Sequence, residues 1–510
     1  MESKKLKNRV YTKEIIFRNS AEAPIDADFT MPDYFAEISK ILKCRAVSRI
    51  SSKSVSGRNI TVDGVLTVTV IYSDESCRLC SYEHQHPFNK TFEADVDIDG
   101  GEIVCSSKCE YINCRAVTSR KIDIHGAVGI GIKVTKRKGT DVITDVDDCN
   151  IELRRGVAPA TSPMGCAEKY LLIEEEIELS GGQPDIRSVI RYDASVALKE
   201  CKLLAGKAMV KGDMTVSLLY CSEDGSAQTV RTVIPCSQIL EIVGITENCE
   251  CEAKAEIAFL EIKPRTSMSG ETKSLSLNAK ILICCETYCN NDVDVVLDAF
   301  SKKYEADIKR NDVCFSKIFC NINENFNCKK SISFPEGSLS SVTDMWCDVR
   351  IDNTKMMDNS LVINGCVLAS IIGVDNCGEP AFFEKAVEFE YKYPLECEVL
   401  GFKCEPSVKV ISSGYTITSA DCLELRMELC VNATVYQCSN MALITDVETD
   451  ESCELKKTDR GAMTIYFANA GENIWDIARR YLASVREIME INGIEDEILA
   501  NNVMIMVPIS

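Results

Sequence analysis

Histidine is scarce in this chain, with three residues among 510, namely His84, His86 and His125. A serine or cysteine nucleophile needs a neighbouring base, most often histidine. His125 lies on the less apolar side of an alternating segment, which favours a half-exposed strand position over a catalytic one. Glycine-rich phosphate loops of the nucleotide-binding kinds are lacking too. We therefore expect no catalytic residue and no cofactor, and the sequence predicts a protein that is not an enzyme.

Long apolar runs and excess positive charge are also missing. The first residues, MESKKLKNRVYTKEIIF, are basic but lack the apolar core of a signal peptide. No window approaches the roughly 18 apolar residues of a membrane helix. The 57 basic and 78 acidic residues give a net charge of −21, which repels phosphate backbones and anionic lipid. We expect a cytoplasmic protein with no transmembrane segment and no nucleic-acid partner.

Cysteine, by contrast, is abundant, with 28 residues. In a protein that is not secreted, cysteines stay mostly reduced and behave as small buried hydrophobes. Cys285 and Cys430 occupy core-like strand positions of this kind. We therefore expect reduced structural thiols.

Of two cysteine clusters in the sequence, one resembles a metal site. Segment 77–86 (CRLCSYEHQH) offers two cysteines and two histidines, which are zinc-ligand types. Its spacing is tighter than that of common zinc fingers, so a polar hairpin turn is the favoured interpretation. Segment 284–289 (CCETYC) has no histidine and is typical of buried strand cysteines. We expect no metal at either place.

One strand-like segment occurs three times. Ile60–Asp74 (ITVDGVLTVTVIYSD) returns as Ala208–Ser222 (AMVKGDMTVSLLYCS) and as Leu361–Asp375 (LVINGCVLASIIGVD). The central glycines stand at positions 64, 212 and 365, so the copies are 148 and 153 residues apart. Apolar residues at every second position predict strands with one face in a core, and a mid-strand glycine predicts a bulge or bend. Whole modules are repeated.

A second alternating segment keeps the same period, beginning at Ile122, Leu275 and Leu423. Turn pairs precede each glycine strand and predict a hairpin in every copy: Ser56-Gly57, Ala205-Gly206 and Asp358-Asn359. With few helical patterns, the sequence predicts a mainly β fold of three tandem β-sandwich-like modules. Modules stacked in series, each with its own core, favour an extended scaffold over an enzyme cleft.

The expected boundaries follow from the repeats and from shifts in composition. They are a basic frayed tail (1–12), three modules (13–150, 166–305 and 314–453), a charged linker (454–463) and a small C-terminal domain (464–510). Segments near 150–166 and 304–314 are expected to be connectors between modules.

The repeats resemble the SPOCS domain, which occurs in spore-coat and cortex morphogenesis proteins of endospore-forming clostridia. The resemblance rests on PDYFAEISKIL with ITVDGVLTVTVIY in the first copy, and on QPDIRSVI with AMVKGDMTVSLLY in the second. The third copy departs from it, because Gly373 stands where the others have Tyr72 and Tyr220. The resemblance implies three SPOCS-like modules.

The C-terminal segment has a β-α-α-β pattern. A short strand (464–467) leads to a helix whose apolar residues recur at i, i+3, i+4, i+7 and i+8 from Ile474 to Leu482. Ser484 and Glu487 form a predicted capping box for a second helix, which Asn492-Gly493 ends before a closing strand. The segment resembles a LysM domain at Tyr466, Gly471, Ile474, Trp475, Ile477, Ala478, Tyr481, Ile488, Asn492 and Pro508.

The LysM resemblance implies a groove that binds N-acetylglucosamine-containing glycans between two loops. Carried over to this chain, the ligand or partner surface comprises Gly471, Glu472, Asn473, Ile474, Asn492, Gly493 and Ile494.

Together, the repeats and the last domain resemble SipL-type spore morphogenesis proteins. That resemblance implies a non-enzymatic scaffold in the mother-cell cytoplasm, at the forespore surface or spore coat. Its LysM domain would dock on the spore-coat basement ATPase, stage IV sporulation protein A. A peptidoglycan-binding anchor is the alternative, and a metal-dependent enzyme using segment 77–86 is a third possibility.

Overall fold

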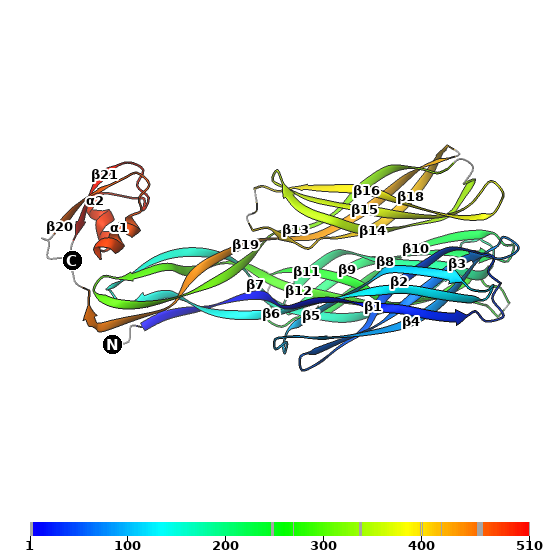
Figure 1. Ribbon diagram of the computed structural model, residues 1–510, viewed down its shortest axis with the longest axis horizontal. Coiled ribbons are helices and arrows are strands. Elements are labelled where there is room, and N and C mark those ends of the chain that lie inside the picture. Colours follow the sequence, from blue (N-terminus) through cyan, green and yellow to red (C-terminus); the bar gives the residue numbers. More distant parts are fainter. Residues whose placement is uncertain are drawn as a thin grey trace.

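The computed structural model describes residues 4–245, 249–268, 270–335, 339–397, 399, 401–419, 421–455 and 463–508. In these residues the chain is mostly β, with two short helices near the C-terminus (Figure 1), as the sequence predicts. The first unit comprises β1 (Lys4–Thr30), β2 (Lys40–Ser56), β3 (Asn59–Ser73), β4 (Leu79–Glu93), β5 (Glu102–Ala116) and β6 (Lys121–Asp147). The second comprises β7 (Ile151–Glu178), β8 (Ile186–Leu204), β9 (Lys207–Ser222), β10 (Ala227–Glu241), β11 (Glu250–Arg265) and β12 (Ser274–Ser301).

The third unit comprises β13 (Tyr304–Ser333), β14 (Ser341–Met357), β15 (Ser360–Val374), β16 (Pro380–Pro394), β17 (Lys403–Cys404), β18 (Ser407–Ser419) and β19 (Cys422–Glu454). The C-terminal domain comprises β20 (Met463–Ala468), α1 (Ile474–Tyr481), α2 (Val485–Asn492) and β21 (Val503–Pro508). The predicted linker 454–463 falls mainly outside the described residues.

Each unit contains two antiparallel sheets with the same strand order. In the first unit the sheets are β2-β3-β4 and β1-β6-β5, and the second and third units repeat this order. Buried residues from both sheets of a unit form one hydrophobic cluster, because the alternating apolar faces of the strands meet there. The predicted hairpins are present in all three units, at the turns between β2 and β3, β8 and β9, and β14 and β15.

The repeated glycine lies opposite a β-bulge, as its mid-strand position predicts. The bulge is on the neighbouring strand, where the register shifts beside Gly64, Gly212 and Gly365. A Cβ atom on Gly212 would lie 2.4 Å from the carbonyl oxygen of Ala197, and one on Gly365 would lie 2.3 Å from that of Arg350. The bulged backbone therefore fills the space that a side chain would need.

The repeat pattern predicts units stacked in series, but the three units pack side by side. The outer faces of β3, β9 and β15 contribute equivalent residues, Ile71, Leu219 and Ile372, to one shared hydrophobic cluster. All three side chains are buried. Arg191 and Asp344, also buried, form an ion pair between the second and third units at 2.8 Å. The alternation of apolar residues does not predict this contact between units, because alternation accounts for only one buried face of a strand.

Long strands of all three units extend beyond the paired sheets toward the end where both termini lie (Figure 1). We call these extensions of β1, β6, β7, β12, β13 and β19 the stalk. Residues from all six strands fill two hydrophobic clusters in it. Equivalent residues from the three units recur in these clusters: Val142, Val295 and Leu443 in one, and Ile143, Val296 and Ile444 in the other.

The stalk corrects three sequence predictions. The expected frayed tail is part of β1, which pairs with β6 from Lys4 onward and buries Val10. The expected connectors near 150–166 and 304–314 are the beginnings of β7 and β13. The sequence does not predict these strands because they are rich in charged and small residues. Their apolar residues are buried against neighbouring units and not in the core of their own unit.

Three equivalent aspartates join the hairpins of the stalk into a closed ring. Each accepts the backbone N–H of the following residue and pairs with a basic side chain of another unit. The pairs are Asp145 with Arg155 on β7, Asp298 with Arg310 on β13, and Asp446 with Lys5 on β1. The third unit thus binds the first.

Candidate functional site

The C-terminal domain has the predicted β-α-α-β order, and its two helices cover one face of the β20–β21 sheet. Ile474, Ile477, Ala478 and Ile488 are buried in a small core between helices and sheet. Ser484 is the N-cap of α2, but its side chain makes no capping hydrogen bond, so the predicted capping box does not form.

Four predicted site residues lie in the loop before α1 or at the start of that helix. Gly471 has a φ of +89°, and its N–H donates to the carbonyl of Leu499 at 2.7 Å. The Glu472 carboxylate accepts from the Tyr466 hydroxyl at 3.0 Å. Asn473 caps α1, with its side-chain oxygen accepting the N–H of Trp475 at 2.8 Å. Ile474 is fully buried.

The other three predicted residues lie at the end of α2. The Asn492 side-chain amide donates to the carbonyls of Ile488 and Met506, at 2.7 and 2.8 Å, and its oxygen accepts the N–H of Met506. Gly493 has a φ of 63° and ends the helix, while Ile494 packs partly into the core. Much of the predicted surface, including the Asn473 and Asn492 side chains, therefore holds the domain together.

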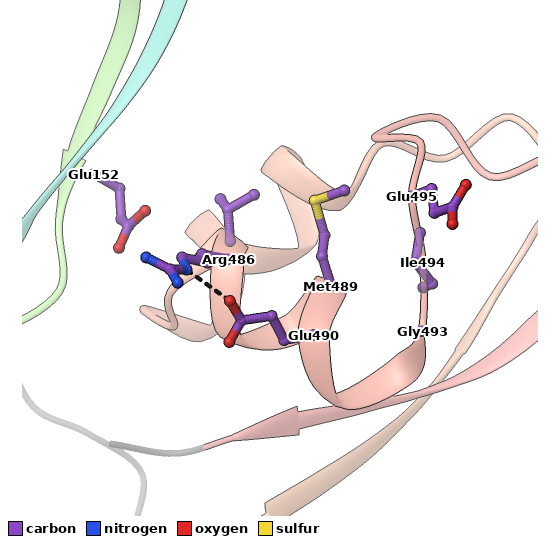
Figure 2. A pocket seen from close by; sticks show the side chains of 8 residues that line it. Glu152, Arg486, Met489, Glu490, Gly493, Ile494 and Glu495 are labelled. Carbon is purple, nitrogen blue, oxygen red and sulfur yellow. Dashed lines mark hydrogen bonds and ion pairs between the residues drawn. The ribbon is translucent and has the colours of Figure 1, made fainter.

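A cavity of about 510 Å³ lies between α2 and the stalk (Figure 2). Its lining includes two of the predicted site residues, Gly493 and Ile494, and not the other five. Figure 2 shows Arg486 paired with Glu490 on α2, with Glu152 of β7 facing them. Uncharged area comes from Val485, Met489 and Ile494, so the lining combines charged and apolar groups.

The outer face of the β20–β21 sheet is apolar and exposed, a feature that the sequence patterns above do not predict. Phe467 is 75 % exposed, Ile465 58 % and Met504 53 %, and Met463 and Met506 are also exposed. The register places Phe467 opposite Met504, Ile465 opposite Met506 and Met463 opposite Pro508. The sequence contains a signal for this exposed face, because the strand 463–468 is apolar at almost every position. The two helices can cover only one side of a two-stranded sheet, so apolar residues on the other side stay exposed.

The domain also contacts the stalk through Trp475, which is buried. Its indole N–H donates to Asp298 of β12 at 2.9 Å, and its ring meets Phe300 edge-on with the centroids 5.0 Å apart. Arg479 adds a second contact to Asp298 at 3.1 Å. The Asp298 carboxylate therefore binds both Arg310 within the stalk and Trp475 and Arg479 of the C-terminal domain.

The cysteine arrangement differs from the sequence expectation in the first unit. Cys44 of β2 and Cys114 of β5 form a disulfide between the two sheets of the first unit, against the expectation of reduced thiols. Their Cα atoms are 6.1 Å apart, within the range that a disulfide spans. Segment 77–86 is not among the groups of converging metal-ligand atoms in the described residues, because most of it runs along β4.

Among the described residues, no helix is long and apolar enough to cross a membrane.

Comparison with known families identifies two kinds of domain. Residues 37–117 and 185–264 match the SipL, SPOCS domain family, and residues 469–500 match the LysM domain family. No curated protein and no solved structure has significant similarity to the chain. These domains are typical of a sporulation protein that carries a peptidoglycan-binding type of module. With SPOCS-family segments ahead of a C-terminal LysM domain, the chain has the domain combination by which it resembles SipL-type sporulation proteins.

Proposed function

We propose that this protein is a non-enzymatic scaffold of endospore formation that docks on the spore-coat basement ATPase, stage IV sporulation protein A, through its LysM domain. It would act in the mother-cell cytoplasm, at the forespore surface or spore coat. The three units would be sandwich-like SPOCS modules that give reach and lateral contacts to coat and cortex assembly. The domain combination supports the sporulation setting.

The observation that favours a protein partner is the exposed apolar face of the LysM sheet. A protein partner can cover a flat face of aromatic and methionine side chains, and such residues are enriched at the centres of protein interfaces. The domain is acidic overall, since residues 463–508 hold seven acidic and three basic residues. The partner surface would be apolar with a basic or neutral rim.

The test is binding of the full-length chain to the purified ATPase. Ile474 is unsuitable for substitution because it is fully buried. Phe467→Glu on the exposed face should weaken binding at least about 30-fold, the effect of losing an interface residue worth about 2 kcal/mol. Leu172→Glu is a matched control, because Leu172 is an exposed apolar residue of β7 that lies opposite Lys280 in the second unit and not in the LysM sheet. Unchanged binding by Phe467→Glu would refute the docking face.

A peptidoglycan-binding anchor is the second candidate, and the cavity beside α2 favours it. A sugar could stack on Met489 and Ile494 while its hydroxyls bond the charged groups of Figure 2. This candidate predicts that the full-length chain is retained on insoluble peptidoglycan. Arg486→Ala should then reduce retention, whereas Phe467→Glu should not. Failure of the wild-type chain to be retained would exclude the anchor.

A further inference from the structure

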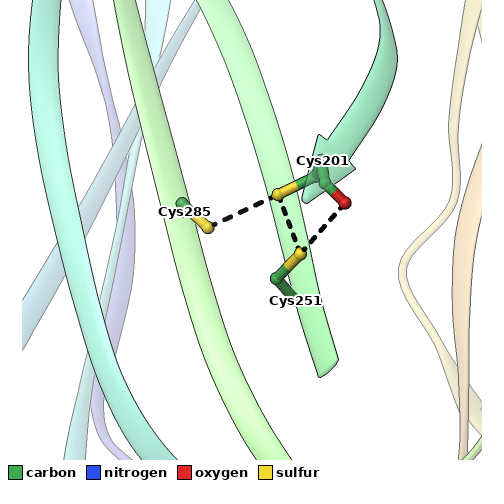
Figure 3. A group of neighbouring side chains, drawn as sticks. All are labelled: Cys201, Cys251 and Cys285. Atoms are coloured by element: carbon green, nitrogen blue, oxygen red, sulfur yellow. Dashed lines mark hydrogen bonds between the residues drawn. The ribbon is translucent and has the colours of Figure 1, made fainter. Parts of the chain in front are cut away.

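Three cysteines that are far apart in the sequence meet at one end of the second unit. Cys201 comes from β8, Cys251 from β11 and Cys285 from β12 (Figure 3). The sulfur of Cys201 lies 2.8 Å from that of Cys251 and 3.8 Å from that of Cys285. The three sulfur atoms all lie within 4.8 Å of one another. β8 belongs to one sheet and β11 and β12 to the other, so the cluster spans both sheets.

The Cys201–Cys285 distance of 3.8 Å suits two thiolates on a single ion, and Cys251 has to move away from Cys201 by about 1 Å to become the third ligand. Zinc–sulfur bonds of about 2.3 Å in a tetrahedral site place the sulfur atoms about 3.8 Å apart. Soft thiolate ligands select zinc and monovalent copper over harder cations. Cys285 is fully buried, whereas Cys201 and Cys251 are partly exposed, so the cluster has both a fixed inner ligand and a side open to solvent.

Core packing does not require cysteine at these positions. The strand registers make Lys53, Ile103 and Ile132 the equivalent residues of the first unit, where the same fold forms without a thiol. A second thiol pair, at 2.8 Å, joins Cys249, the residue just before β11, to Cys289 of β12. Thiols are thus concentrated at this end of the second unit.

We propose that Cys201, Cys251 and Cys285 bind one thiophilic d¹⁰ cation, Zn²⁺ or Cu⁺, which links the two sheets of the second unit. As each sulfur binds the ion, its thiol proton passes to the solvent, so the metal bonds form without any change of oxidation state. Zn²⁺ would keep water as a fourth ligand, and Cu⁺ would be three-coordinate. The site is independent of the LysM surface and of the scaffold function.

The direct test uses the full-length chain purified without oxygen and with a reductant. Elemental analysis should find one zinc or one copper per chain, which also tells the two cations apart. Titration of the metal-free chain with Co²⁺ should produce a sulfur-to-cobalt charge-transfer band that reaches its plateau at one equivalent and disappears on addition of Zn²⁺. Absence of both Zn²⁺ and Cu⁺ binding, or a disulfide between Cys201 and Cys251 under these conditions, would overturn the proposal.

Variants locate the ion. Cys285→Ser and Cys201→Ser should each lose the charge-transfer band and the bound ion, with circular dichroism reporting whether the sheets persist. Cys236→Ser is the matched control, because Cys236 is a buried thiol in the same hydrophobic cluster and is not among the converging ligands. Chelation should lower the Tm of the wild type and leave that of Cys285→Ser unchanged. Retention of the ion by a Cys201, Cys251 and Cys285 triple variant would refute the assignment.

Discussion

Gly212 shows what a single residue contributes to the repeated unit. Beside the bulge in β8, the carbonyl oxygen of Ala197 lies only 2.4 Å from the position that a Cβ atom on Gly212 would take. The sequence could reveal that a glycine is needed here, because three copies place it at the same point of an alternating strand. It could not reveal that the bulge lies on the partner strand, since periodicity within one strand carries no information about its neighbour's register.

We predict that Gly212→Ala destabilises the protein by about 1–3 kcal/mol, because backbone atoms must move to admit the methyl group. Thermal unfolding measures the effect as a fall in Tm. Gly181→Ala is the control, since Gly181 has open space around it and an ordinary backbone conformation, so a change within about 0.5 kcal/mol is expected. Equal effects of the two substitutions would contradict the steric explanation.

Tyr72 and Tyr220 explain, at the same scale, why the third copy departs from the motif. Their hydroxyls donate to the carbonyls of Ala36 and Pro184, at 2.8 and 3.2 Å, which secures the segment leading into each unit. At the equivalent position, the side chain of Leu339 lies against Gly373 and fills the space. The residues matched to the SPOCS family lie in the two copies that keep the tyrosine.

At the scale of elements, the LysM domain was predictable in its order and core but not in its exposed surface. Helix periodicity located Ile474 and Ile477, which are buried as expected. The loop residues carried over by resemblance include Asn492, whose side chain ties α2 to β21. Residue type alone does not tell whether a polar group faces a ligand or its own backbone. The exposure of Phe467 was not predicted because an apolar strand residue is usually buried.

We predict that Asp298→Asn loosens the LysM domain from the stalk. The carboxylate accepts from the Trp475 indole and from Arg479, and a charged hydrogen bond contributes about 1.5–3 kcal/mol. Tryptophan emission should therefore shift to longer wavelength as Trp475 becomes hydrated. Asp145→Asn is the matched control, since the equivalent aspartate of the first unit pairs with Arg155 instead. An unshifted spectrum for Asp298→Asn would show that this contact does not hold the domain.

At the scale of the whole molecule, the side-by-side arrangement could not be derived from the sequence. Ile71 and Tyr72 are consecutive, and so are Leu219 and Tyr220, which signals strands buried on both faces. The signal does not say what covers the second face. In this protein Ile71, Leu219 and Ile372, the equivalent residues of the three units, cover one another in a shared cluster. The arrangement depends on contacts between residues hundreds of positions apart, which local patterns do not encode.

Ring closure between the third and first units predicts a pH dependence of stability. The Lys5 ammonium hydrogen-bonded to Asp446 lowers the pKa of that carboxyl from its ordinary 3.8 to about 2. Folding therefore favours the ionised form, and this contribution is complete above about pH 4 and is lost as the pH falls toward 2. Denaturant unfolding of wild type and Lys5→Met should differ near pH 6 and converge near pH 2. A constant difference across this range would rule out the contribution of this ion pair.

The pairing of Lys5 with Asp446, 441 residues apart, also governs how the chain is made. A ribosome must release almost the entire polypeptide before the first strand can meet its final neighbour. Until then, Val10 and Val142 lack the side chains of β13 and β19 that later cover them. Interrupted synthesis would leave an intermediate with exposed apolar side chains. Chaperones or rapid completion of translation would be needed to prevent its aggregation.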